Sequence, residues 1–372
     1  MKKSCALIGL FIFLSCITGC GVSNKKAFDI KSVSYSSLPG WKSDDFKEAL
    51  PALISNCQAM ATKPDWKVFC DGVVRLKDST STQIRKFIES TMTPYAVYSY
   101  GSQTGTFTGY YEASLNGSLN KDEKNKFPIY GLPEDLVALD TKTFCKSGDD
   151  TGIRVGRIEN GKFLPYLKRS EINEGNFKAP VLFWVDDPVD AFILHIQGSG
   201  RVETSEGIYH VGYAGNNGHD FVGIGSILKE DGVLEAGKCS MPDIRQWLKE
   251  NPKKATEYMN KNPRYIFFKT AGKTDGPLGA LGVPLTPKRS LAVDTRFIPL
   301  GTPVYLSTSD PDGDDIRQLV VAQDVGGAIK GAVRGDFFWG YGEDAFQKAG
   351  RMKSEGKYYI LWPKGATPPA AF

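Results

Sequence analysis

Three aspartates in the C-terminal third of the chain are the residues whose type and placement most clearly indicate chemistry. Asp294 lies in VDTRFIPLG, Asp324 in QDVGGAIKG and Asp336 in RGDFFWG. Each stands beside a glycine or a turn sequence at the edge of an apolar run, where an unpaired charge is costly. Carboxylates that gather without a histidine favour acid chemistry on sugars.

Asp336 is the sharpest candidate for a proton donor. It follows Arg334 and Gly335 and precedes Phe-Phe-Trp. Burial among aromatic rings raises the pKa of a carboxyl group, and a nearby Asp324 would raise it further. Such a group holds a proton near neutral pH and can deliver it to a glycosidic oxygen. The alternative is that Asp336 caps a turn or a helix N-terminus.

The other two aspartates have simpler local explanations. Asp324 ends the apolar run RQLVVAQ and precedes Val-Gly-Gly, which permits close approach of a ligand or a strand. Lys330 follows closely enough to pair with an acid, although a turn that ends the strand would also explain Asp324. Asp294 precedes Thr-Arg, so we expect it to support the site by fixing a strand end through Arg296.

Two glycine-rich segments and one loop carry side chains typical of sugar sites, in which flat rings stack and amides or hydroxyls form hydrogen bonds. The segments are FTGYYE and HIQGSGRV, and the loop is GYAGNNG. The GSG sequence lacks the GK[ST] and helix start of a phosphate loop. His195 lies in the apolar run AFILHIQ, which favours a buried core histidine, and the loop has ordinary turn chemistry as its alternative. The glycan contacts that we expect are Thr108, Gly109, Tyr110, Gln197, Gly198, Ser199, Gly200, Tyr213 and Lys330.

The first twenty residues, MKKSCALIGLFIFLSCITGC, read as a secretory signal. The apolar run is about a dozen residues long, whereas a membrane span needs roughly 20. The ending ITGC resembles a bacterial lipobox, which implies cleavage before Cys20 and a lipid anchor on its sulfur. Gly21 in place of Asp implies sorting to the outer membrane, facing the periplasm. The alternative is an ordinary signal peptide that happens to contain Cys20.

Composition argues against several classes of protein. The formal net charge of +4 is spread along the chain without a dense basic block, so we expect no nucleic-acid partner. Three histidines and no CxxC spacing predict neither a metal site nor a cofactor. The oxidising periplasm permits disulfides among Cys57, Cys70, Cys145 and Cys239. Three pairings are open, and Cys57 with Cys70 is the closest in sequence.

The pattern of elements along the chain is helical, then β, then helical, then β. Helical spacing covers residues 43–95, with a break at Pro51, and returns in DFVGIGSILKEDGVL and MPDIRQWLKENPKKATEYMNKN. Short strands are predicted at FPIYGLP, FLPYLKR, APVLFWVDD, AFILHIQGSGRV and GIYHVGYAG, and again from RYIFFK to KYYILW. We therefore predict a signal peptide (1–19), a tether (20–42), an outer domain (43–105 and 256–365) and an inserted β-domain with following helices (106–255).

Several motifs occur in a fixed order between about residues 105 and 363: TGYYE, HIQGSGRV, GYAGNNG, YIFFK, VDTRFIPLGTPVY, and QDVGGAIKG followed by GDFFWG. Together they resemble the membrane-bound lytic murein transglycosylase A family. The last segment also resembles the broader 3D, or three-aspartate, domain and the expansins. The resemblance implies a mainly β protein with flanking helices, built from a double-psi β-barrel and a smaller inserted β-barrel with a groove between them.

The resemblance also implies an activity: cleavage of the β-1,4 bond between N-acetylmuramic acid and N-acetylglucosamine with formation of a 1,6-anhydromuramoyl end. Asp336 matches the single catalytic acid and base, and Asp324 the acid that supports it. The family often has His-Phe before this aspartate, whereas this chain has Arg334 and Gly335. The implied partners are peptidoglycan glycan strands, the outer membrane through the lipid anchor, and candidate cell-wall synthesis or hydrolysis proteins.

Two other functions stay open on the sequence. A non-catalytic peptidoglycan-binding or wall-loosening lipoprotein would bind glycan without cutting it. A hydrolase would need a second essential carboxylate and would leave reducing ends.

Overall fold

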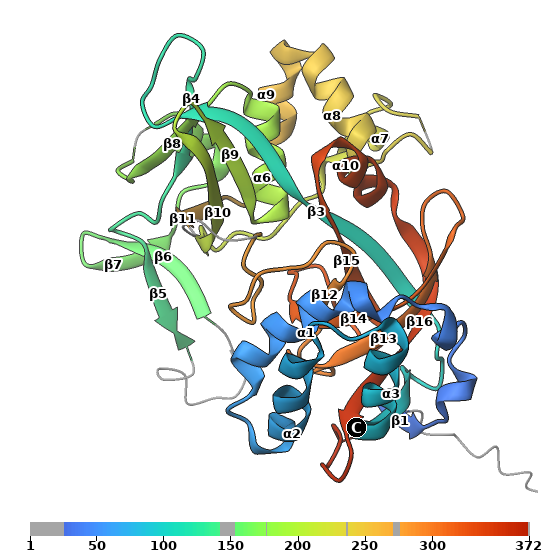
Figure 1. The fold of residues 1–372 in the computed structure, drawn as a ribbon. Helices are drawn as coiled ribbons and strands as arrows, with labels where there is room; N and C mark the ends of the chain where they lie inside the picture. The colour runs from blue at the N-terminus through green and yellow to red at the C-terminus, as the bar shows by residue number, and fades with distance from the viewer. Residues whose placement is uncertain (1–25, 142–152, 176, 236, 271–275, 371–372) are drawn as a thin grey trace, which may run out of the picture.

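The computed structural model describes residues 26–141, 153–175, 177–235, 237–270 and 276–370. The protein is mainly β with flanking helices, as the sequence predicts (Figure 1). The strands are β1 (Asp29–Ser32), β2 (Met92–Tyr98), β3 (Gly105–Ser118), β4 (Phe127–Tyr130), β5 (Val137–Asp140), β6 (Ile153–Glu159), β7 (Lys162–Pro165), β8 (Val181–Val185), β9 (Gly200–Thr204), β10 (Gly207–Asn216), β11 (Ile266–Thr270), β12 (Ser290–Val293), β13 (Pro303–Ser309), β14 (Asp315–Asp324), β15 (Arg334–Tyr341) and β16 (Lys353–Pro363).

The C-terminal strands form a closed barrel. Strand pairing runs from β3 to β15, β12, β14, β13 and β16, and β16 pairs back to β3. Two of these pairs, β12 with β14 and β15 with β3, are parallel. Closure removes free strand edges and encloses a core of large apolar side chains, among them Phe107, Phe337 and Tyr358.

The middle strands form a second, smaller ring. The C-terminal half of β3 pairs with β9, and pairing continues through β10 to β11. On the other side β3 pairs with β8 and β8 with β4. A single bridge between Gly131 and Phe268 joins β4 to β11. The 14-residue strand β3 therefore belongs to both rings, and it carries the chain from one to the other (Figure 1).

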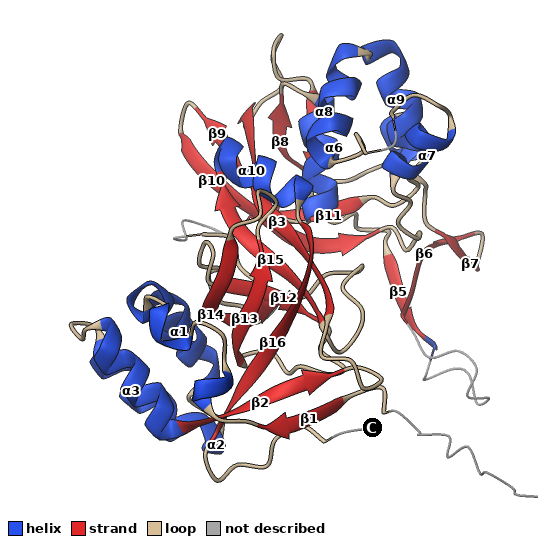
Figure 2. Ribbon diagram, turned by 90° about the vertical axis from the view of Figure 1, so that its right-hand side faces the viewer, coloured by secondary structure: helices blue, strands red, loops and turns tan. Residues whose placement is uncertain are grey.

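Helices cover the outside of both rings. Figure 2 shows one group beside the C-terminal barrel and a second group over the middle strands. The first group is α1 (Phe46–Met60), α2 (Pro64–Val73) and α3 (Ser81–Thr91), with the 3-10 turns η1 (Tyr35–Ser37), η2 (Trp41–Ser43) and η3 (Val74–Leu76). The second is α5 (Arg169–Asn173), α6 (Pro188–Gln197), α7 (Ile224–Glu230), α8 (Met241–Glu250) and α9 (Pro252–Asn260), and α10 (Gly342–Arg351) follows β15.

A disulfide and a buried ion pair hold the first helix group together and against the barrel. Cys57 of α1 is bonded to Cys70 of α2, which is the sequence-adjacent pairing. Arg289 donates to Asp44 at 2.9 Å, and both side chains are almost fully buried. The Asp44 carboxylate also accepts from the backbone of Leu319 at 2.7 Å, so its charge is fully hydrogen-bonded.

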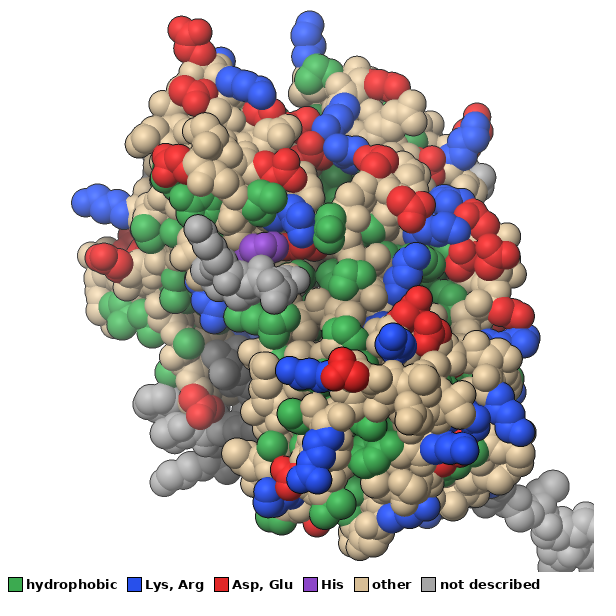
Figure 3. Space-filling model, in the orientation of Figure 1, with side chains coloured by type: hydrophobic (Ala, Val, Ile, Leu, Met, Phe, Trp, Pro, Cys, Tyr) green, Lys and Arg blue, Asp and Glu red, His purple; other side chains and the backbone are tan. Residues whose placement is uncertain are grey.

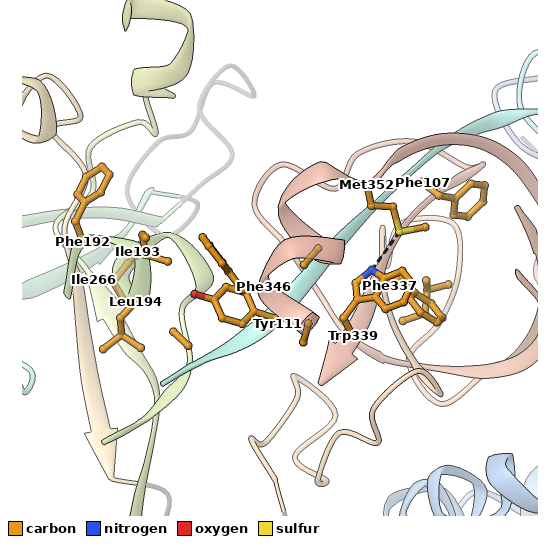
Figure 4. Close-up of a cluster of buried hydrophobic side chains, with 14 of the residues drawn as sticks. Phe107, Tyr111, Phe192, Ile193, Leu194, Ile266, Phe337, Trp339, Phe346 and Met352 are labelled. Carbon is orange, nitrogen blue, oxygen red and sulfur yellow. Dashed lines mark hydrogen bonds between the residues drawn. The ribbon is translucent and has the colours of Figure 1, made fainter. Parts of the chain in front are cut away.

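The two rings share an apolar junction. Figure 4 shows Tyr111 and Phe346 lying between Leu194 of the middle region and Trp339 of the barrel. The Tyr111 and Phe346 rings are 5.2 Å apart, and the Trp339 indole donates to the Met352 sulfur at 3.4 Å. Aromatic contacts of this kind hold β3 in one position relative to β15.

Two sequence predictions of secondary structure are wrong. The segment AFILHIQ is helix α6 rather than a strand, because Asp187 caps its N-terminus and Pro188 occupies its first turn. Helix α1 runs through Pro51 without a break. His195 on α6 is buried as predicted, and its Nδ1 accepts from the backbone of Ile266 at 3.1 Å.

Two predicted boundaries also differ from the structure. Part of the expected tether is ordered, since β1 pairs with β2 and the Phe28 and Trp41 side chains are buried. The predicted insert ends at residue 255, yet β11 pairs with β10 and so stays with the middle ring. In both places strand pairing between distant segments, which local composition does not encode, sets the boundary. Cys20, Cys145 and the signal sequence lie outside the described residues.

Candidate active site

The parallel register of β3 and β15 brings two of the predicted residues together. Asp336 lies opposite Thr108 in this ladder. The Thr108 hydroxyl donates to Asp336 Oδ1 at 2.5 Å, across 228 residues of sequence. A short hydrogen bond to a carboxyl oxygen holds that group in one rotamer.

The pKa of Asp336 is suited to a proton donor. Burial raises its pKa from the ordinary 3.8 to about 6, and the negative charge of Asp324 adds to the rise. The Thr108 hydrogen bond and the Arg334 charge act in the opposite direction. The residue keeps partial exposure, so a proton on it can still reach a bound molecule.

Asp324 lies two strands away from Asp336. Ala292 of β12 pairs with Asp324 on one side and with Asp336 on the other. Two strand spacings separate the two backbones by about 10 Å. Asp324 accepts from the Tyr110 hydroxyl at 3.0 Å and from two backbone N–H groups, those of Ala280 at 3.0 Å and its neighbour Val325. Burial raises the pKa of Asp324, while these hydrogen bonds lower it.

Asp294 forms the pair with Arg296 that the sequence predicts. Its buried carboxylate accepts from the Arg296 guanidinium, with the shortest contact at 2.6 Å. It also accepts from the backbone of Gly331 at 2.8 Å, in the loop between Asp324 and Asp336. The Arg296 hydrogen bonds lower the pKa of Asp294 to about 2. Asp294 is therefore a permanent anion that ties the end of β12 to this loop.

Several residues expected to bind glycan also form contacts that build the site. Tyr110 and Thr108 hold the two carboxyl groups. A side chain at Gly109 would meet the Trp339 indole at 2.6 Å, and one at Gly200 would meet the backbone of Ala113 at 2.6 Å. These two glycines permit close packing of the strands on either side of the junction.

The remaining predicted residues form local contacts or are exposed. Gln197 accepts from the backbone of Tyr111 at 3.3 Å, and Gly198 ends α6 in the left-handed conformation, with Ser199 following it. Tyr213 is 48% exposed on β10, and Lys330 is exposed. Within the described part of the chain no ion pair joins Lys330 to a carboxylate, so the expected pairing is not found.

Arg334 is a site residue that the sequence analysis treated only as a departure from the family pattern. Its guanidinium donates to the Thr108 hydroxyl at 2.9 Å and to the Thr106 carbonyl at 3.3 Å. Burial lowers its pKa, and the charge of Asp336 raises it. The spacing could have indicated this role, because residues 334 and 336 of one strand lie on the same face of the sheet.

The sequence also did not predict a charged cluster farther along β3, formed by Glu112, Arg201 and His210. The fully buried Glu112 carboxylate accepts from Arg201 at 2.9 Å and lies 2.6 Å from His210 Nδ1. The Arg201 guanidinium lies 3.8 Å from the centre of the Tyr341 ring, at the end of the strand that carries Asp336. The cluster therefore links β9 and β10 of the middle ring to β15.

Hydrophobic, acidic and basic side chains are interspersed on the face of the molecule that is seen in Figure 3. A cavity of about 390 Å³ is lined by residues such as Asp44, Glu48 and Arg317 and by none of the site residues above. Among the described residues no cluster of histidine, cysteine and acidic side chains is arranged to hold a metal ion. No helix in the same part of the chain is long and apolar enough to cross a membrane.

Comparisons with known proteins agree with this architecture. Residues 106–269 match the family model "MltA specific insert domain", and residues 289–362 match "3D domain". The crystal structure of MltA from Neisseria gonorrhoeae is 37% identical, with a TM-score of 0.82 over 92% of this chain and 94% of that one. The membrane-bound lytic murein transglycosylase of Agrobacterium tumefaciens is 31% identical, with a TM-score of 0.78 over 90% and 98%.

A curated protein matches over a shorter region. Membrane-bound lytic murein transglycosylase A of Vibrio cholerae is 29% identical over 266 residues, which cover 68% of this chain and 64% of that protein. The matched region thus spans less than two thirds of the curated relative. The two rings, the three aspartates and these matches define one class, and this chain belongs to the membrane-bound lytic murein transglycosylase A family.

Proposed function

We propose that this protein is a lytic transglycosylase. It cleaves the β-1,4 bond between N-acetylmuramic acid and N-acetylglucosamine in peptidoglycan and leaves a 1,6-anhydromuramoyl end. The observation that carries the proposal is the environment of Asp336, whose pKa burial raises to about 6 while Thr108 holds one of its oxygens. Membership of the family supports the same activity.

In the first step Asp336 acts as a general acid. It gives its proton to the glycosidic O4, the bond from C1 of the muramic acid to that oxygen breaks, and the N-acetylglucosamine leaves as an alcohol. Positive charge develops at C1 and its ring oxygen. The Asp336 carboxylate that remains is stabilised by the Thr108 hydrogen bond and by the Arg334 charge.

In the second step the same carboxylate acts as a general base. It takes the proton from the C6 hydroxyl of the muramic acid while that oxygen bonds to C1, which closes the anhydro ring and restores the protonated Asp336. No water is consumed. The attacking hydroxyl is tethered to the reacting sugar and therefore has a high effective concentration. One carboxyl group is sufficient for this cycle, whereas a hydrolase that inverts or retains needs two.

Asp324 and Asp294 have indirect roles in this proposal. The negative charge of Asp324 raises the pKa of Asp336 and keeps it protonated at higher pH. Asp294 fixes the loop that joins the two acids. We place the glycan in a groove between the two rings, with Gln197, Ser199 and Tyr213 on the side of the middle ring.

The proposed location is the periplasmic face of the outer membrane. It rests on the lipobox-like sequence that ends at Cys20 and on the family, some of whose members are named as membrane-bound. Labelling with radioactive palmitate in cells tests the anchor: the natural chain should incorporate label, and Cys20→Ser should not. Incorporation into the Cys20→Ser chain would rule out this attachment site.

The activity is tested by digesting isolated murein with the purified protein and with Asp336→Ala. The natural protein should release anhydromuramoyl products, identified by mass spectrometry, and Asp336→Ala should release none while it still sediments with murein. Asp315→Ala is the matched control, because its side chain is exposed on β14. Release at the natural rate by Asp336→Ala would refute the mechanism. Binding by the natural protein without any product would favour the wall-loosening alternative.

A further inference from the structure

We propose that Arg334 is a positioning residue that, through the Thr108 hydroxyl, assigns the transferable proton of Asp336 to Oδ2. The inference rests on the proposed function and concerns which oxygen of Asp336 gives and takes the proton. It starts from a chain of two hydrogen bonds, from Arg334 to Thr108 at 2.9 Å and from Thr108 to Asp336 at 2.5 Å.

The direction of this chain is set by the donors. A guanidinium carries five N–H groups and no acceptor, so Arg334 can only donate to the Thr108 oxygen. The Thr108 hydroxyl has a single hydrogen, and that hydrogen must point away from the guanidinium. The nearest acceptor is Asp336 Oδ1. Arg334 therefore orients the Thr108 hydrogen toward Asp336.

A fixed hydrogen on Thr108 decides where Asp336 carries its own proton. A proton on Oδ1 would take the place of the Thr108 hydrogen, which would then have no acceptor among the described residues. Oδ1 is therefore an acceptor in both ionisation states. Oδ2 has no hydrogen-bond partner among the described residues, so it is free to hold the proton and later to accept one.

Arg334 is itself held in place for this role. Its guanidinium also donates to the carbonyl oxygens of Thr106 and Gly335. The strand ladder sets the same register, with Arg334 opposite Thr106 and Asp336 opposite Thr108. Arg334 thus contacts β3 at Thr106 and Thr108, and through Thr108 it fixes the hydrogen bond to Asp336. The histidine that the family often has nearby would not be restricted to donating, because a neutral imidazole also accepts.

The test compares Arg334→Met with Arg334→Lys, and Thr108→Val with Thr108→Ser. Each conservative variant retains the donor or the hydroxyl, and each of the others removes it. We expect Arg334→Met and Thr108→Val to lower kcat roughly tenfold to hundredfold, within the contribution of a positioned general acid, with KM changed less than about threefold. Both should move the midpoint of the pH profile upward, since Arg334 and Thr108 both lower the pKa of Asp336.

The double variant gives the sharpest result. Because the two residues act in one chain, the loss in Arg334→Met/Thr108→Val should match the larger single loss rather than the product of the two. The conservative variants should recover most of kcat. Arg317→Met, an exposed arginine on β14, is the control for removing a positive charge. Thermal melting checks that each variant folds, and Thr108→Val carries the test if Arg334→Met does not fold.

Three outcomes would overturn the inference: multiplicative losses in the double variant, a change confined to KM, or an unmoved pH midpoint in both single variants. The proposed function fails separately, since it requires anhydromuramoyl products from the natural protein. Natural products together with an unaffected Arg334→Met would reject the role of Arg334 alone.

Discussion

The pH dependence of glycan cleavage follows directly from the environment of Asp336. The group must be protonated at the start of the cycle, and burial raises its pKa to about 6. It is then about 90% protonated at pH 5 and about 10% protonated at pH 7, so the rate should fall roughly tenfold between them. A carboxyl group with the ordinary pKa of 3.8 would be about 6% and about 0.06% protonated, a roughly hundredfold fall at much lower activity.

Asp324→Asn is the perturbation that tests the cause. Asparagine keeps an acceptor for the backbone of Ala280 and removes the negative charge that raises the pKa of Asp336. The profile should therefore move to lower pH, with the rate at pH 5 reduced less than the rate at pH 7.

The assay is the initial rate of anhydromuramoyl release from murein between pH 4 and 8, at fixed ionic strength. Asp315→Asn, exposed on the same strand as Asp324, should leave the midpoint unchanged. A midpoint near 4 for the natural protein, or an upward move in Asp324→Asn, would refute the reasoning.

Three further predictions concern stability, measured by urea unfolding. Asp294→Asn should lower the free energy of unfolding by about 1–2 kcal/mol at pH 7. Because the pKa of Asp294 in the folded protein is about 2, this difference should shrink as the pH falls from 4 toward 2. A difference that does not depend on pH would contradict the prediction. Replacing Cys57 and Cys70 with alanine should lower the free energy of unfolding by about 3 kcal/mol, because the disulfide closes a short loop. An unchanged free energy of unfolding would show that the bond is absent from the native protein. Glu112→Ala should lower the free energy of unfolding by about 3–5 kcal/mol, because the Arg201 charge, which is only 13% exposed, is left unpaired. Exposed Glu203→Ala should lower it by less than about 0.5 kcal/mol.

The sequence predicted those features that depend on residues close together in the chain. The apolar run RQLVVAQ before Asp324 predicted a strand, and it is β14. The Asp-Thr-Arg sequence predicted the pair between Asp294 and Arg296, which forms between residues two positions apart in the chain. The apolar AFILHIQ run misled because a fully buried helix and a buried strand look alike over seven residues.

Contacts between distant segments could not be predicted in this way. Thr108 and Tyr110 were predicted only as sugar contacts, and the structure shows that they also hold acids more than 200 residues away. The parallel register of β3 and β15 decides that contact, and nothing local to FTGYYE encodes it. The same register brings Arg334 to Thr108, and the path of β3 through both rings brings Glu112 to Arg201.

The most direct test of the central claim, that one carboxyl group cleaves glycan without water, is digestion of murein in water enriched in heavy oxygen. The account predicts muramoyl ends that are lighter than the reducing sugar by one water and carry no heavy oxygen, and no such ends from Asp336→Asn. Heavy oxygen incorporated at C1 of the muramoyl ends would show hydrolysis and contradict the claim.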